Sequence, residues 1–126
     1  MVTTKEMYTI IILEDEVDIL ALYSDYVSRN GHGVLGTYLN ADTIFQDIDI
    51  EPPDVYIIGY RLPGHKNGID IAIEILNRFP SASILFITAF ELLHTEISKN
   101  PIFYGKNTQV LVKPVKLDKI EKSMLE

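Results

Sequence analysis

Apolar and polar positions along this chain follow two different patterns. Short runs rich in Ile and Val, with no polar alternation, are typical of strands covered on both faces of a sheet. Five such strands are predicted, at residues 8–13, 34–38, 55–58, 84–88 and 109–112. Longer segments of helical period separate them, which is the signature of βαβ units and a parallel sheet. The pattern therefore predicts a three-layer α/β fold.

Five segments between and after these strands are predicted to be helical. In the first, Leu20, Tyr23 and Val27 fall on one face, and Gly31 supplies a stop. The fourth is expected to be short, because Pro101 prevents its continuation, and the stretch after it shows no regular period. The second to fifth helices are expected at about residues 41–48, 68–79, 91–99 and 117–125, in that order.

The third predicted helix is apolar around an unusually large part of its circumference. At about 100° per residue, its Ile, Ala and Leu side chains cover an arc of roughly 200°. A helix that covers one sheet face needs only about half of that arc. We favour a deeply seated helix whose edges are covered by neighbouring loops. A surface for a partner or for self-association is the other interpretation.

The composition is that of a globular chain. It has 126 residues, of which 47% are hydrophobic and 23% charged, and residues 1–126 are expected to form a single domain. The absence of Cys excludes disulfide and thiol chemistry. Neither an N-terminal apolar segment nor a run of membrane-spanning length is present, so a cytoplasmic location is expected.

The chain is acidic. Its 11 Lys and Arg against 18 Asp and Glu give a net charge of -7, and no cluster of basic residues is evident. Direct binding to nucleic acid or to an anionic membrane is therefore disfavoured. A protein partner is the expectation that remains, with a homodimer left open. His32, His65 and His94 lie in separate segments without metal-ligand spacing and are expected to be exposed or in turns.

Four of the predicted strands end on motifs in a fixed order. The acids Glu14-Asp15-Glu16 follow the first strand, Gly59 the third, Thr88 ends the fourth, and Lys113-Pro114 follows the fifth. This order resembles the receiver domain of response regulators over nearly the whole chain. The resemblance implies a flavodoxin-like, doubly wound sheet of five parallel strands in the order 2-1-3-4-5. It also implies a module of, or derived from, a two-component phosphorelay.

Loops that leave the carboxyl ends of parallel strands converge at one edge of the sheet. We therefore expect one receiver pocket, lined by Glu14, Asp15, Gly59, Thr88 and Lys113. In receivers the acids help to hold Mg²⁺ and an aspartate accepts the phosphoryl group, while the Thr donates to that group and the Lys pairs with its charge. The Lys-Pro peptide is often cis in this family.

Gly59 stands where the resemblance implies the phosphorylated aspartate. Glycine has neither a nucleophilic oxygen nor a metal ligand, so this position cannot carry an aspartyl phosphate. Lys113 is then expected to neutralise Asp15. Two opposite charges about 4 Å apart attract by roughly 4 kcal/mol at an effective dielectric near 20.

Two further positions follow from the resemblance. The Arg61 carbonyl would face a metal beside Glu14 and Asp15. Without a third carboxylate, Glu14, Asp15 and Lys113 sum to a charge of -1, so the site would bind Mg²⁺ weakly at most, and no cofactor is required. Val110 occupies the place of the switch Tyr or Phe. The fourth helix, fifth strand and fifth helix commonly form the partner-binding face of receivers, so a shortened fourth helix bears on function.

We therefore expect a pseudo-receiver that is not an enzyme and acts by phosphorylation-independent protein interaction. A histidine kinase, an output domain or another signalling protein would be the partner. Two alternatives stay open. One is a residual phosphoryl-accepting enzyme that uses Asp15 or Glu14 as its nucleophile. The other is a small-ligand sensor, in which the space left at Gly59 admits a metabolite or an anion beside Lys113 and Thr88.

Overall fold

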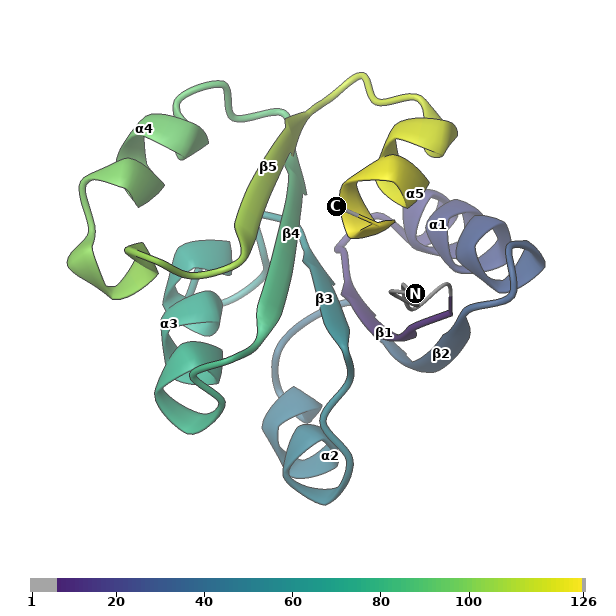
Figure 1. The fold of residues 1–126 in the computed structure, drawn as a ribbon, viewed down its shortest axis with the longest axis horizontal. Helices are drawn as coiled ribbons and strands as arrows, with labels where there is room; N and C mark the ends of the chain where they lie inside the picture. The colour runs from purple at the N-terminus through teal and green to yellow at the C-terminus, as the bar shows by residue number, and fades with distance from the viewer. Residues whose placement is uncertain (1–6, 126) are drawn as a thin grey trace, which may run out of the picture.

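The computed structural model describes residues 7–125, which form a parallel sheet between two layers of helices (Figure 1). The strands are β1 (Thr9–Leu13), β2 (Gly33–Tyr38), β3 (Val55–Ile58), β4 (Ser83–Thr88) and β5 (Thr108–Val112). Their order is β2-β1-β3-β4-β5 and every pair is parallel. This confirms the predicted flavodoxin-like fold.

The helices alternate with the strands along the chain. They are α1 (Val17–Arg29), α2 (Ile44–Ile50), α3 (Gly68–Arg78), α4 (Leu93–Ser98) and α5 (Leu117–Leu125), with a 3₁₀ helix η1 (Pro101–Phe103). In Figure 1, α1 and α5 lie on one side of the sheet and α3 and α4 on the other. Within residues 7–125, none of these helices has both the length and the hydropathy needed to cross a membrane.

Two apolar clusters, one on each face of the sheet, join the layers. Alternate strand residues point to opposite faces, so Ile10 and Ile12 pack with α1 and α5 whereas Ile11 and Leu13 pack with α2, α3 and α4. All four are at most 2% exposed. Burial on both faces is the physical reason why the strand sequences lack polar alternation.

Two helices differ from their predicted bounds for local reasons. The α2 helix begins three residues later than predicted, because the Asn40 side chain accepts a hydrogen bond from the Asp42 N–H at 3.0 Å and holds the chain in a turn. The α4 helix has only six residues. It is followed by η1, which starts at Pro101 and confirms the predicted break.

The α3 helix is deeply seated, as the favoured interpretation had it. Five of its residues are buried, and Ile69 and Ile73 at the edges of its apolar arc are partly buried against the same core. Its start is fixed by a capping box: Asn67 accepts from the Asp70 N–H, and the Asp70 carboxylate accepts from the Asn67 N–H. The wide apolar arc is therefore explained by packing within the domain.

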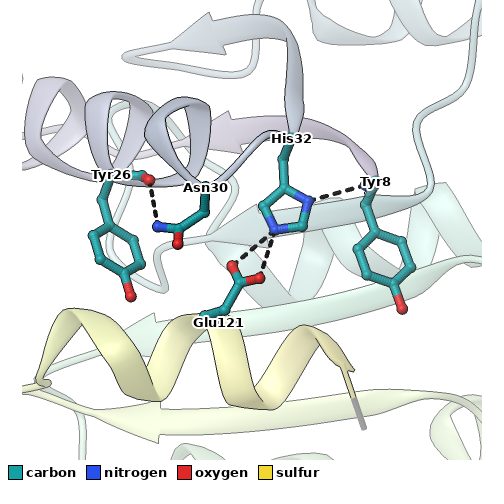
Figure 2. A network of polar contacts seen from close by, with 5 residues as sticks. All are labelled: Tyr8, Tyr26, Asn30, His32 and Glu121. Carbon is teal, nitrogen blue, oxygen red and sulfur yellow. Dashed lines mark hydrogen bonds and ion pairs between the residues drawn. The ribbon is translucent and has the colours of Figure 1, made fainter. Parts of the chain in front are cut away.

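His32 is buried, at 4% exposure, and the prediction that it is exposed or in a turn is wrong. Figure 2 shows its ring between β1 and α5. Its Nδ1 accepts a hydrogen bond from the Tyr8 N–H at 3.0 Å, so Nε2 carries the proton and donates to the Glu121 carboxylate, 2.7 and 2.9 Å away. Because Glu121 lies 89 residues further along the chain, no local pattern could indicate the pair. His65 and His94 are exposed, as predicted.

The His32–Glu121 pair should contribute measurably to stability. Glu121→Ala would leave a buried imidazole N–H without its acceptor, which costs about 1–3 kcal/mol. Denaturant unfolding of the variant measures this loss. Lys122→Ala is the matched control on the same helix, and it should change stability by less than about 0.5 kcal/mol because Lys122 is exposed. Equal losses for the two variants would contradict the assignment.

Candidate functional site

The carboxyl ends of β1, β3, β4 and β5 meet at one edge of the sheet and bring all five predicted pocket residues together. They line a single pocket of about 140 Å³. The remaining lining residues are Glu16, Tyr60, Arg61, Ile87, Ala89 and Phe90. The pocket thus combines charges from loops that are far apart in the sequence.

Gly59 follows β3 directly and is buried in the pocket wall. Its N–H donates to the Leu13 carbonyl at 2.9 Å. A Cβ at this position would lie 3.7 Å from that carbonyl oxygen and 3.8 Å from Oε1 of Glu14, both ordinary van der Waals distances. Its φ is not positive, so neither space nor backbone geometry requires glycine here. A side chain at residue 59 would face Glu14.

Gly68, in contrast, must be glycine. A Cβ there would lie 2.3 Å from the Gly59 carbonyl oxygen, closer than real Cβ contacts allow. Its N–H also donates to the Tyr60 carbonyl at 2.7 Å. The first turn of α3 is therefore packed directly against the backbone of residues 59 and 60, and this contact holds one wall of the pocket in place.

Lys113 pairs with Glu14, and the prediction that it would neutralise Asp15 is wrong. Nζ of Lys113 donates to Oε1 of Glu14 at 3.0 Å, and the Glu14 side chain is only 4% exposed. Oε2 of Glu14 accepts from the Glu16 N–H at 2.9 Å. Lys113 pairs with Glu14 because Glu14, directly after β1, is buried, whereas Asp15 is exposed in the turn that follows. The Lys113–Pro114 peptide is cis, as the resemblance implied.

Glu14 is the pocket residue whose pKa is most clearly shifted by its surroundings. Burial raises the pKa of its carboxyl group above the ordinary value, and a hydrogen bond with Asp15 acts in the same direction. The Glu16 N–H and Lys113 lower the pKa, but these two effects offset the increase only in part. The pocket therefore holds a carboxylate whose charge is incompletely compensated.

The pocket also contains two aromatic residues that were not predicted from the sequence. The rings of Tyr60 and Phe90 stack with centroids 4.7 Å apart, joining the loop after β3 to the loop after β4. Thr88 is 4% exposed, and its Oγ1 accepts from the Phe90 N–H at 3.0 Å. Val110 lies partly buried against the core on the α3 and α4 side. An aromatic pair separated by 30 positions has no sequence signature.

The donor set fits Mg²⁺ poorly. Mg²⁺ requires a near-octahedral set of oxygen ligands and dehydrates reluctantly. Carboxylate oxygens of Glu14, Asp15 and Glu16 lie within 4.8 Å of one another. However, both Glu14 oxygens already accept hydrogen bonds, and Gly59 supplies no ligand. Arg61 lines the same pocket, where its charge opposes a second cation.

Comparison with known structures shows the same fold. A signal receiver domain of a modulated diguanylate cyclase from Desulfovibrio desulfuricans G20 is 23% identical, with a TM-score of 0.78; 94% of this chain and 90% of that chain are covered. The PhyR receiver domain from Erythrobacter litoralis is 23% identical, with a TM-score of 0.77, and 94% and 87% of the two chains are covered. At these identities the likeness concerns the fold alone.

NtrX from Brucella abortus, in a complex with ADP, is 25% identical with a TM-score of 0.76. The match covers 94% of this chain but only 27% of NtrX. No curated protein matches the chain. The family model of the response regulator receiver domain matches residues 10–125. The chain therefore belongs to the response regulator receiver domain family of two-component systems.

Proposed function

We propose that this receiver domain is a pseudo-receiver that acts by phosphorylation-independent protein interaction and is not an enzyme. In this proposal residues 1–126 form one module, whose partner is a histidine kinase, an output domain or another signalling protein. The observation that carries it is Gly59 at the end of β3, in the pocket wall, at a position where any side chain would face Glu14. A receiver without a carboxylate at this point has no acceptor for the phosphoryl group.

The charges around Gly59 support the same proposal. Lys113, which would otherwise be free to pair with a phosphoryl group, donates to Glu14 at 3.0 Å. Thr88 is tied to the next loop through the Phe90 N–H. Thr88 uses its Oγ1 only as an acceptor there and keeps its O–H as a donor. The charge of Lys113 is partly neutralised by Glu14 within the domain, and Val110 provides no aromatic ring to transmit a change.

Neither alternative function has an observation in its favour. As a nucleophile, Glu14 would have to give up its bonds to Lys113 and Glu16, and Asp15 is exposed, outside the buried part of the site. A sensor of anions is disfavoured, because three carboxylates in the pocket oppose one lysine and one arginine. The volume of about 140 Å³ is also below the range of about 300–1,000 Å³ that is usual for small-molecule sites.

The proposal predicts that a small phosphodonor leaves the protein unmodified. After incubation with acetyl phosphate and Mg²⁺, the intact mass of the wild type should be unchanged, since residue 59 offers no oxygen nucleophile. Gly59→Asp treated in parallel serves as the comparison. A stable phosphoryl adduct on any acid of the wild type would overturn the phosphorylation-independent proposal.

Restoring a carboxylate should restore a response to metal. Gly59→Asp would place a third acid beside Glu14 and Asp15, so repulsion should lower the melting temperature of the metal-free protein. Added Mg²⁺ should then raise it, because the ion binds the folded state preferentially. Gly59→Asn is the matched control, with the same shape but no charge. Equal Mg²⁺ responses of the wild type, Asp and Asn proteins would show that residue 59 does not face the acids.

The raised pKa of Glu14 predicts the sign of a pH effect. The folded state binds the Glu14 proton more tightly than the unfolded state does, so the stability that this group contributes falls as pH rises from the ordinary carboxyl pKa through the folded value. Glu14→Gln cannot ionise and should be more stable than the wild type at pH 7. The difference should vanish below about pH 4. Unfolding curves of the wild type and Glu14→Gln, recorded in EDTA at pH 7 and below about pH 4, measure the two differences. A Glu14→Gln protein less stable than the wild type at pH 7 would contradict the raised pKa of Glu14.

A further inference from the structure

The stacked rings of Tyr60 and Phe90 connect the loop after β3 with the loop after β4. The backbone pairing of β3 with β4 ends before these loops begin. Beyond it, within the described part of the chain, no hydrogen bond or ion pair joins residues 59–67 to residues 88–92. The ring stack, with centroids 4.7 Å apart, therefore bridges two loops that the backbone leaves separate.

Tyr60 is fixed to the first turn of α3. Its carbonyl accepts from the Gly68 N–H at 2.7 Å, and its Cα lies only 3.0 Å from the place that a Cβ on Gly68 would take. Its hydroxyl oxygen accepts from Nδ2 of Asn67 at 3.4 Å, and Asn67 belongs to the capping box of α3. The ring of Tyr60 is therefore held by α3 at both its backbone and its hydroxyl end.

Phe90 lies in the segment that leads from β4 into α4. Its N–H donates to Oγ1 of Thr88 at 3.0 Å, and its carbonyl accepts from the Leu93 N–H at 3.2 Å. Leu92, the N-cap residue of α4, provides no capping side-chain hydrogen bond. A helix of six residues is not stable without tertiary contacts. The start of α4 therefore depends on the burial of Leu93 and on the position of Phe90.

We propose that the Tyr60–Phe90 stack is a latch that holds the start of α4 in one position, whatever the charge of the pocket. Both rings line the pocket together with Gly59 and Thr88. A change in the pocket reaches α4 along the chain through Thr88 and Phe90, and the Phe90 ring is stacked on a residue that α3 holds. The inference deepens the proposed function and rests on it, because a latched α4 presents the same surface with or without a phosphoryl group.

Phe79 provides a matched comparison for the latch. Phe79 and Phe90 are both partly buried against the same apolar cluster. Among the described residues Phe79 has no stacked aromatic partner, and it ends α3 instead of joining two loops. A change from Phe to Leu therefore removes a similar apolar contact at either position, but it removes a ring stack only at residue 90.

Native-state hydrogen exchange of the full chain tests the latch, with the Leu93 amide as the probe and the Ile84 amide in β4 as the reference. Phe90→Leu and Tyr60→Leu should each raise the exchange rate of Leu93 relative to Ile84 about fivefold, as expected for the loss of one aromatic pair. The double variant should show no larger increase, because the two rings act as one unit. Phe79→Leu and Tyr60→Phe keep the stack and should stay within about twofold of the wild type.

Glu14→Gln tests whether α4 follows the charge of the pocket. It removes that charge and leaves both rings in place, so the Leu93 rate relative to Ile84 should stay within about twofold of the wild type. The latch is overturned if Glu14→Gln raises this rate as much as the ring variants do, if Phe79→Leu matches Phe90→Leu, or if the effects of the two ring variants add in the double variant. The proposed function fails by a different result, a phosphoryl adduct on the wild type, so the two failures are distinguishable.

Discussion

The ion pair between Lys113 and Glu14 is the contact on which the rest of the pocket depends. It joins the ends of β5 and β1 across the sheet edge, at 3.0 Å and with the carboxylate almost fully buried. A buried carboxylate without a partner would cost several kcal/mol. The loops that follow these two strands are therefore arranged so that each of these charges has an internal partner.

The proposed function rests on this pair together with the other features of the pocket. Its cation is already engaged, its third carboxylate is absent at Gly59, and its donor set suits Mg²⁺ poorly. The stacked rings of Tyr60 and Phe90 tie two of its loops together. These features are the basis of the proposed function, in which the domain acts through its surface rather than through phosphoryl transfer.

Much of the fold could be predicted from sequence because strand burial and helix period are local signals. The apolar runs indicated all five strands, and Pro101 indicated the end of α4. Pairings between distant residues could not be predicted. His32 with Glu121, Tyr60 with Phe90, and the choice of Glu14 over Asp15 by Lys113 depend on side-chain directions that only the folded chain fixes.

The central claim, that no carboxylate is available to accept a phosphoryl group, is tested most directly with beryllofluoride, which mimics a phosphoryl group by bonding to a carboxylate oxygen. A ¹⁹F NMR spectrum of the wild type with Mg²⁺ and beryllofluoride requires no assumption about reaction rates. The account predicts resonances of the free fluoride species alone. A protein-bound fluoride resonance would contradict it.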